Sequence, residues 1–446
     1  MAATLPVMSP PPAPPAGLRA RLSSANPFLD AGAPTSRSAV LDSLRGVAIL
    51  LVLGAHFVME PNSAGLFSPV AGLWYRIGWA GVDLFFVLSG YLVTGLLFAE
   101  YRAHGRVDLK RFLVRRGFKI WPAYFAYVGF VGLWLVAKQW QGDDAGVGEL
   151  WPNLLHVQNY FGTPRVHTWS LAVEEHFYLV GALLAALWLT PGRDAASVRG
   201  FPLLGAAALA TLALVRFGEW TLRGPDAVNI FATHLRFDGL LCGSLLAYFA
   251  QFERARLAPL EARPALCLGL GVALAAPTLL LTPDHSAWIA GPGLTVMYVG
   301  FGLVVIAARG WEARRAPAPG RVRRALLGAM QRIGIASYGI YLWHVDLAQT
   351  PLVKVGAAAA NWGVPAEAGW LLVTGAYVFI AFVTGTVLTR LIELPMLGVR
   401  DRLFPSRLEP APARPPAEEP SLSPAGQLAA LALPPAAGRS IAPGVG

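Results

Sequence analysis

One histidine ends an otherwise apolar stretch near the N-terminus and is the first candidate for chemistry. The segment LDSLRGVAILLVLGAH places His56 eleven residues after Arg45, with only apolar or small side chains between them. A helix rises 1.5 Å per residue, so the two residues would lie about 16 Å apart along its axis, roughly half the thickness of a bilayer's hydrocarbon core. An imidazole at that depth is either a general base or a buried histidine that bonds to a neighbouring helix.

Two carboxylates are candidates to orient the His56 imidazole. Asp83 interrupts the apolar segment GWAGVDLFFVLSGYLVTG near its outer end, at a depth similar to that of His56. Glu174 stands in VHTWSLAVEEHFYLV, at the mouth of a later apolar segment. A carboxylate beside an imidazole fixes its tautomer and raises its basicity. We therefore predict a catalytic group of His56, Asp83 and Glu174; the alternative is that Asp83 bonds a nearby helix end.

A basic cluster predicts a polyanionic ligand. The segment KRFLVRRGFKIWPAYF places Arg116 and Lys119 three residues apart, before Pro122, which begins or kinks the helix. Guanidinium groups bind phosphates bidentately, so the cluster of Arg115, Arg116 and Lys119 is predicted to suit a polyanionic ligand that arrives from the cytoplasm. The alternative is a cluster that only anchors the helix at the inner membrane surface.

Further polar and aromatic residues interrupt apolar segments toward their outer ends and are predicted to line a cavity or bind a second ligand. They are Trp169, Tyr178, Arg236 and His344. His344 follows Arg332 by twelve residues, or about 18 Å of helix, which is nearly the depth of His56. With the basic cluster at the inner boundary and Trp169, Glu174 and Arg236 at the outer rim, we predict that two ligands enter one cavity from opposite sides.

The composition requires a membrane to position these residues. Of the 446 residues, 55% are hydrophobic and only 14% are charged, whereas about a quarter is normal for a soluble domain. The long apolar segments predict an all-α polytopic membrane protein with about ten transmembrane helices. The predicted spans lie near residues 43–60, 77–99, 119–137, 170–190, 201–215, 234–251, 265–282, 288–308, 332–350 and 367–390. They form one domain over residues 41–403, between Pro- and Ala-rich tails at 1–40 and 404–446 that are predicted to be disordered.

The distribution of basic residues predicts the orientation. Most of the 36 Lys and Arg residues fall in the two tails and in alternate loops between the spans. The positive-inside rule places that side in the cytoplasm, so we predict cytoplasmic termini and a location in the cell membrane. The net charge of +10 then reflects topology and not nucleic acid binding. Cys242 and Cys267 lie in apolar segments and the histidines lack a metal-binding spacing, so no disulfide and no metal site is expected.

Several motifs in a fixed order resemble those of the acyltransferase-3 family of membrane acyltransferases. They are LDSLRG with its following histidine, GVDLFFVLSGYL, RRGFKIWPAYF, HTWSLAVEEHFYL, RFDGLLCG, ASYGIYLWH and IELP. The resemblance implies transfer of an acyl group, usually acetyl, from acyl-CoA to a hydroxyl of a carbohydrate-type acceptor. It also implies that acyl-CoA is a co-substrate and not a bound cofactor, and that Arg45 and His56 are essential.

One position departs from the family pattern. The family's second motif has two arginines three residues apart, whereas here Lys119 follows Arg116, and a lysine lacks the bidentate fork. Within the resemblance, Arg45, Arg116 and Lys119 hold the CoA phosphates, while the four outer polar and aromatic residues lie toward the acceptor. The sequence leaves open whether His56 is a general base or a transient acyl carrier.

A transporter is the rival hypothesis. A proton-coupled transporter or flippase of an amphipathic metabolite would use His56 and Asp83 as a proton relay. We find no inverted repeat between the two halves of the sequence, which argues against this hypothesis.

Overall fold

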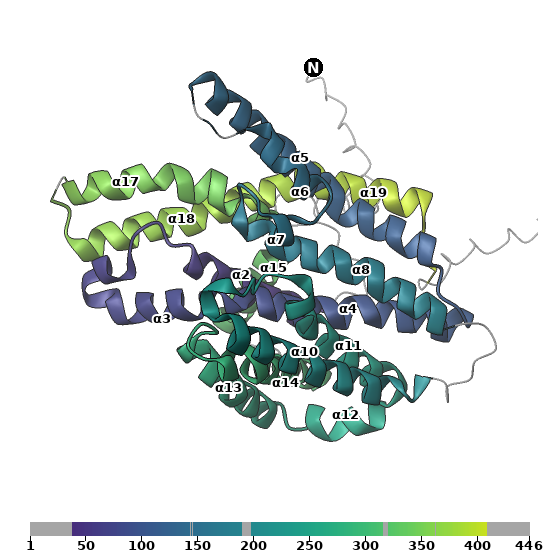
Figure 1. Cartoon of the computed structure of the whole chain (residues 1–446). Coiled ribbons are helices and arrows are strands. Elements are labelled where there is room, and N and C mark those ends of the chain that lie inside the picture. The colour runs from purple at the N-terminus through teal and green to yellow at the C-terminus, as the bar shows by residue number, and fades with distance from the viewer. Residues whose placement is uncertain are drawn as a thin grey trace, which may run out of the picture.

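The structure is a computed structural model that describes residues 38–142, 144, 146–189, 198–314, 320–361 and 363–407. Every regular element in these residues is a helix, which confirms the prediction of an all-α fold (Figure 1). The tails predicted at 1–40 and 404–446 lie almost entirely outside the described residues, so their disorder stays a prediction.

The helices differ widely in length. The long ones are α2 (Ala39–Ala55), α4 (Ala80–His104), α5 (Leu109–Trp140), α8 (Trp169–Trp188), α10 (Phe201–Arg223), α11 (Thr233–Phe252), α13 (Pro264–Leu281), α14 (Leu294–Ala313) and α18 (Ala366–Leu388). The shorter ones are α3 (Ser68–Gly78), α6 (Trp151–Leu154), α7 (Gln158–Phe161), α12 (Arg254–Glu261), α15 (Arg321–Ile335), α16 (Ser337–Trp343), α17 (Thr350–Asn361) and α19 (Leu394–Leu403). Short 3₁₀ turns join several of them, and π-helical turns occur at η5 (Ile289–Gly293), η6 (His344–Gln349) and η7 (Thr389–Glu393).

Within the described residues, seven helical segments are long and apolar enough to cross a membrane, which supports a multi-pass membrane protein. They correspond to seven of the predicted spans. The other three predicted spans coincide with α2, which has 17 residues, with α11, which carries Arg236 and Asp238, and with α16, which gives way to the π-helical η6. These helices are shorter, more polar or interrupted, so the count of ten and the cytoplasmic termini stay predictions.

One of the two alternatives for Pro122, that it begins the helix, is wrong, and so is the outer end predicted for the first span. Helix α5 does not begin at Pro122; it begins at Leu109, where the Asp108 carboxylate accepts a 3.0 Å hydrogen bond from the Arg111 backbone N–H, and it runs through the proline. Helix α2 ends at Ala55, so His56 is its C-terminal boundary residue and does not lie four residues inside a span. The 32 residues of α5 would be about 48 Å long, longer than a bilayer core, and in Figure 1 this helix leans away from the bundle.

Helices α4 and α11 run parallel and pack closely at the centre of the bundle. A Cβ on Gly90 would lie 1.9 Å from the Leu240 carbonyl oxygen, and a Cβ on Gly243 would lie 2.1 Å from the Val87 carbonyl oxygen, so only glycine permits this approach. Because the helices are parallel, residues that precede the two glycines by the same distance come together. This packing brings Asp83 of α4 to Arg236 of α11.

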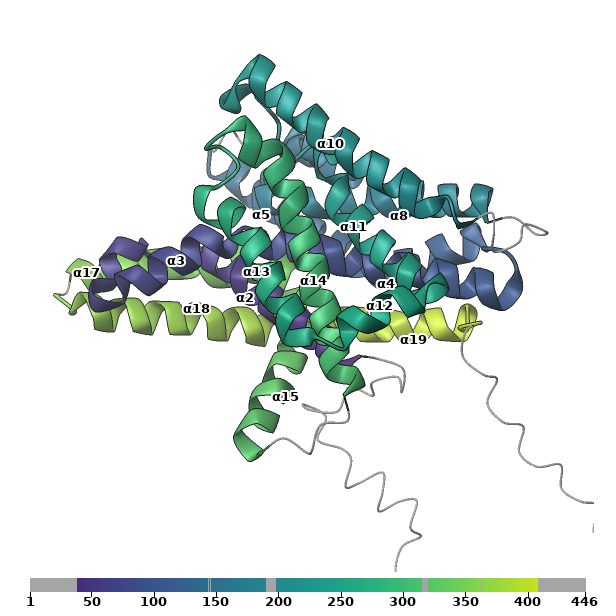
Figure 2. The ribbon, with the colours of Figure 1, turned by 90° about the horizontal axis from the view of Figure 1, so that it is seen from below.

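Helix α15 departs from the direction of the bundle. It crosses α2 where Gly334 approaches so closely that a Cβ there would lie 1.7 Å from the Asp42 carbonyl oxygen. In Figure 2, α15 then extends away from the other helices, while α3, α17 and α18 lie together at one end of the molecule.

Candidate active site

The three predicted phosphate-binding residues and Glu174 line one cavity. Its volume is about 110 Å³, and α2, α4, α5, α8 and α16 contribute to its wall. The polar residues on this wall are Arg45, Arg116, Lys119, Ser89, Ser170, Glu174, Tyr178, Ser337, Tyr338 and Tyr341. Three basic side chains face one carboxylate, so the cavity, which we call the basic cavity, suits an anionic ligand.

The consecutive residues Arg115 and Arg116 of α5 have different partners. The Arg116 guanidinium lies 5.4 Å from the centroid of the Tyr178 ring and 5.8 Å from that of Phe112, inside the cavity wall. Arg115 instead pairs with Asp401 of α19 at 3.3 Å and donates to the Phe404 carbonyl. Aromatic rings hold the Arg116 guanidinium in place and leave its N–H donors for a ligand.

Glu174 belongs to this cavity and not to the outer rim, which corrects the sequence-based prediction of its position. The Tyr178 hydroxyl donates a 2.8 Å hydrogen bond to the Glu174 carboxylate, and the Ser89 hydroxyl lies 2.7 Å from the Tyr178 oxygen. Since the Tyr178 proton is used on the carboxylate, Ser89 is the donor to Tyr178. The chain of hydroxyls fixes Glu174 beside the basic side chains, one helical turn deeper than Ser170.

His56 and His344 come together, as their predicted depths indicate. Their ring centroids are 4.9 Å apart, and His167, from the start of the HTWS motif, lies 5.4 Å from His344. The sequence analysis did not select His167, although its position two residues before Trp169 was a signal. We call His56, His167 and His344 the histidine cluster.

Backbone carbonyls set the tautomers in this cluster. The His56 Nδ1 lies 2.9 Å from the Val52 carbonyl oxygen, and the His344 Nδ1 lies 2.8 Å from that of Tyr341. A carbonyl oxygen only accepts, so each Nδ1 carries the proton and each Nε2 has a free lone pair. The His344 Nε2 is buried and has no hydrogen-bond partner in the described part of the chain. His56 is thus held by its own helix as a proton acceptor without help from a carboxylate.

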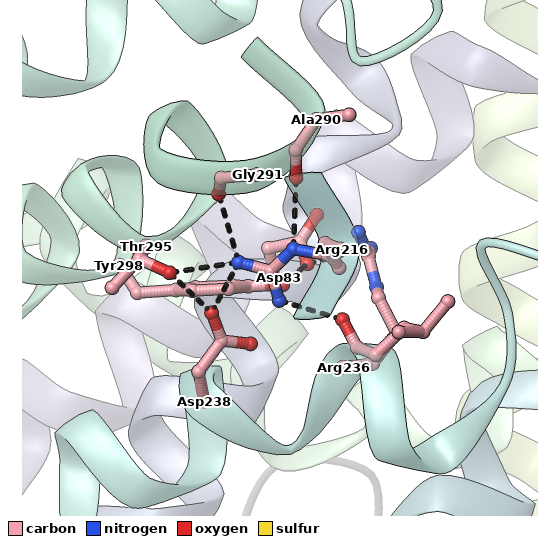
Figure 3. A network of polar contacts seen from close by, with 9 residues as sticks. Asp83, Arg216, Arg236, Asp238, Ala290, Gly291, Thr295 and Tyr298 are labelled. Atoms are coloured by element: carbon pink, nitrogen blue, oxygen red, sulfur yellow. Dashed lines mark hydrogen bonds and ion pairs between the residues drawn. The ribbon is translucent and has the colours of Figure 1, made fainter. Parts of the chain in front are cut away.

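The predicted pair of Asp83 with His56 is wrong. The Asp83 carboxylate accepts 2.7 Å hydrogen bonds from the Arg236 guanidinium and from the Tyr298 hydroxyl, and its side chain is fully buried (Figure 3). The parallel packing of α4 and α11 brings Arg236 closer than any imidazole. The Arg236 guanidinium also lies 5.2 Å from the centroid of the Trp169 ring, so these two predicted cavity residues pack on each other.

A second buried ion pair extends this network. Arg216 of α10, which is only 1% exposed, donates a 2.7 Å hydrogen bond to Asp238 and others to the Ala290 and Gly291 carbonyls (Figure 3). Arg216 lies one residue beyond the span predicted at 201–215, so the sequence did not indicate that it is buried. The network joins α4, α10, α11, α14 and η5, and none of its residues lines the basic cavity.

Tyr341 connects the basic cavity to the histidine cluster. It lines the cavity, its ring centroid is 5.8 Å from that of His167, and its hydroxyl donates to the His167 carbonyl. Ser170 lies 2.6 Å from the same hydroxyl and therefore donates to it. The two parts of the site are thus adjacent, and Tyr341 contacts both. The described residues contain no group of His, Cys, Asp or Glu suited to a metal ion.

Comparison with known proteins assigns this arrangement to a family. A family model described as an acyltransferase domain matches residues 39–390. The chain is 26% identical over 340 residues to the peptidoglycan O-acetyltransferase OatA of Listeria monocytogenes serovar 1/2a, which covers 71% of this chain and 50% of that protein. It is 27% identical over 329 residues to the O-acetyltransferase OatA of Staphylococcus aureus strain NCTC 8325, covering 69% and 50%.

The chain spans about half the length of the curated relatives it matches. No solved structure matches it. The family match covers most of the chain and includes every residue of the basic cavity and the histidine cluster. The chain therefore belongs to the acyltransferase-3 family.

Proposed function

We propose that the protein transfers an acyl group, in the first place acetyl, from acyl-CoA to a hydroxyl of a carbohydrate-type acceptor such as a cell-surface glycan. The observation that carries the proposal is that one helix, α2, contributes Arg45 to the basic cavity and ends at His56 in the histidine cluster. The names of the relatives, which include a peptidoglycan O-acetyltransferase, support the acceptor class.

The donor binds in the basic cavity. The phosphates of acyl-CoA are held by Arg45, Arg116 and Lys119, and the flexible arm of CoA extends toward Tyr341. Arg45 and His56 are eleven residues apart, about 16 Å along the helix, so the arm must carry the thioester past Tyr341 to reach the imidazole. The positive-inside rule places this entrance in the cytoplasm and the protein in the cell membrane. Acyl-CoA is consumed as a co-substrate, and no bound cofactor is required.

The transfer step uses the free lone pair of His56. The Nε2 of His56 accepts the proton of the acceptor hydroxyl while the hydroxyl oxygen attacks the thioester carbonyl carbon. The C–S bond breaks, the ester forms, and the proton passes from the imidazole to the departing CoA thiolate. A covalent route, in which His56 carries the acyl group between two such attacks, gives the same products.

The positions in the structure favour an acceptor that approaches from the histidine cluster. Trp169 and Arg236 lie beside the buried ion-pair network, and Glu174 and Tyr178 lie in the basic cavity. This leaves His56, His167 and His344 as the groups nearest to the acceptor hydroxyl. The donor and the acceptor then meet at Tyr341, from opposite sides of that ring.

The test is an assay of the purified protein for CoA release from acetyl-CoA. We expect slow release alone and faster release, with a labelled ester product, when peptidoglycan fragments or polysaccharides are added. The same assay with His56→Ala separates enzymatic transfer from spontaneous thioester hydrolysis. Tight acetyl-CoA binding with no ester formed on any hydroxyl acceptor would contradict the proposal.

A further inference from the structure

A second cavity lies on the side of the molecule where α3, α15 and α18 meet. Its volume is about 640 Å³, and it shares no residue with the basic cavity or the histidine cluster. Apolar side chains dominate its wall, among them Ile333, Leu371, Phe379 and Phe382. We call it the α15–α18 groove. Nothing in the transfer reaction uses it.

The groove has the length of a lipid chain in one leaflet. Along α18 it runs from Trp370 to Phe382, twelve residues or about 18 Å of helix, whereas one leaflet contributes about 15 Å of hydrocarbon. Phe379 is 66% exposed, so this wall faces the surroundings of the protein. Trp74 of α3 also lines the groove. Its side chain is fixed because the indole N–H donates a 2.9 Å hydrogen bond to the Leu50 carbonyl of α2.

The charge at the groove belongs to Arg332 of α15. This side chain is exposed, lines the groove, and makes no hydrogen bond or ion pair with another described residue. Helix α15 carries three further arginines, at positions 321, 323 and 324, and exposes Val322 and Leu326. A helix with basic and apolar exposed residues is typical of the membrane interface, and in Figure 2 α15 projects below the bundle, across the direction of α18.

We propose that the α15–α18 groove binds an anionic phospholipid, with one acyl chain along α18 and the headgroup phosphate at Arg332. A zwitterionic lipid would satisfy the apolar wall equally well, but its headgroup would also bring a positive charge toward the arginines. Basic groups at a membrane surface select anionic lipids by about 1 kcal/mol each. In the orientation proposed above, the lipid comes from the cytoplasmic leaflet.

The experiment uses the purified full-length protein in detergent with phosphatidylglycerol or phosphatidylcholine added, and measures retained lipid by native mass spectrometry. The first pair of variants tests charge. We expect Arg332→Gln to lower phosphatidylglycerol retention about fivefold and Arg332→Lys to preserve it. Arg254→Gln removes the same charge from α12, which contributes no residue to the groove, and should leave retention unchanged.

The second pair of variants tests the groove itself. A Cβ on Gly375 would meet no atom within 4 Å, so the backbone leaves room for a larger side chain, and Gly375→Phe, which places a ring in the groove, should abolish retention. Gly129 of α5 is equally open, so Gly129→Phe is the matched control and should retain the lipid. Equal retention of both lipids, an equal loss in Arg254→Gln and Arg332→Gln, or full retention in Gly375→Phe would each overturn the proposal. CoA release, measured in parallel, does not enter this test.

Discussion

Arg236 donates a 2.7 Å hydrogen bond to Asp83, although the two residues lie 153 positions apart in the chain. Both side chains are buried, and the Asp83 carboxylate also accepts a hydrogen bond from Tyr298. The pair therefore joins α4, α11 and α14 at the depth where Trp169 packs. This position indicates that Asp83 stabilises the helix arrangement and does not act on His56.

Removal of the Asp83 charge should destabilise the protein. Asp83→Asn leaves the Arg236 guanidinium buried without its counter-charge, which costs about 3–5 kcal/mol. Thermal unfolding of the purified protein in detergent measures this loss. The double variant Asp83→Leu with Arg236→Met removes both charges and should recover much of the stability. If a stable double variant lost acyl transfer entirely, Asp83 would regain its predicted catalytic role.

His56→Ala should abolish acyl transfer while acyl-CoA binding stays near wild type, because the imidazole lies outside the basic cavity. A general base contributes roughly 100 to 10,000-fold to the rate. Single-turnover transfer rates and CoA binding by calorimetry measure the two effects separately. His285→Ala, at an exposed position between α13 and η5, is the control. Transfer within about tenfold of wild type would leave His56 with a structural role only.

The basic cavity predicts different effects for neighbouring arginines. Arg116→Gln should raise the KM for acyl-CoA by about tenfold or more, since hydrogen bonds to charged groups contribute roughly 1.5–3 kcal/mol. Arg115→Gln, whose charge is already paired with Asp401, should change KM little. Lys119→Arg should keep or lower KM, because it restores the bidentate fork. Equal effects of the Arg115 and Arg116 variants would place the CoA phosphates elsewhere.

Glu174→Gln should tighten CoA binding at low salt, because it removes the negative charge that faces the three basic groups of the cavity. A carboxylate at the outer rim, by contrast, would leave CoA binding unchanged and impair only the acceptor. Equilibrium binding of CoA to the purified variant, compared at low and high salt, measures the electrostatic part. No change in CoA affinity at low salt would contradict the shared position of Glu174 and Arg116.

The topology prediction is tested with reporters. One fused after Arg439 and one inserted at Arg106, in the short connection between α4 and α5, should both report the cytoplasm. The same reporter inserted at Asp144, in the connection after α5, should report the outer side. A cytoplasmic signal from Asp144 or an external one from Arg106 would invalidate the ten-span model.

The sequence predicted the helices and the similar depth of His56 and His344, because apolar periodicity and helix rise determine depth along each helix. It did not predict which side chains of different helices contact one another at a given depth. The parallel packing of α4 and α11 brings Asp83 into contact with Arg236. Glu174 lies on the face of α8 that lines the basic cavity, beside the basic residues. Depth is a property of one helix, whereas lateral neighbours depend on crossing geometry, which Gly90 and Gly243 set through contacts distant in the chain.

Tyr341 contacts both the basic cavity and the histidine cluster, and this position has a consequence for the proton gradient across the membrane. In the proposed function, the donor and the acceptor enter from opposite faces of the membrane. A continuous water-filled passage through the basic cavity and the histidine cluster would then let protons flow down their gradient. The Tyr341 ring lines the basic cavity and is held by Ser170 and the His167 carbonyl, so we expect it to block such a passage. We expect Tyr341→Ala to make proteoliposomes leaky to protons, which a pH-sensitive dye inside the vesicles would report, whereas Tyr341→Phe keeps the ring and should keep them tight.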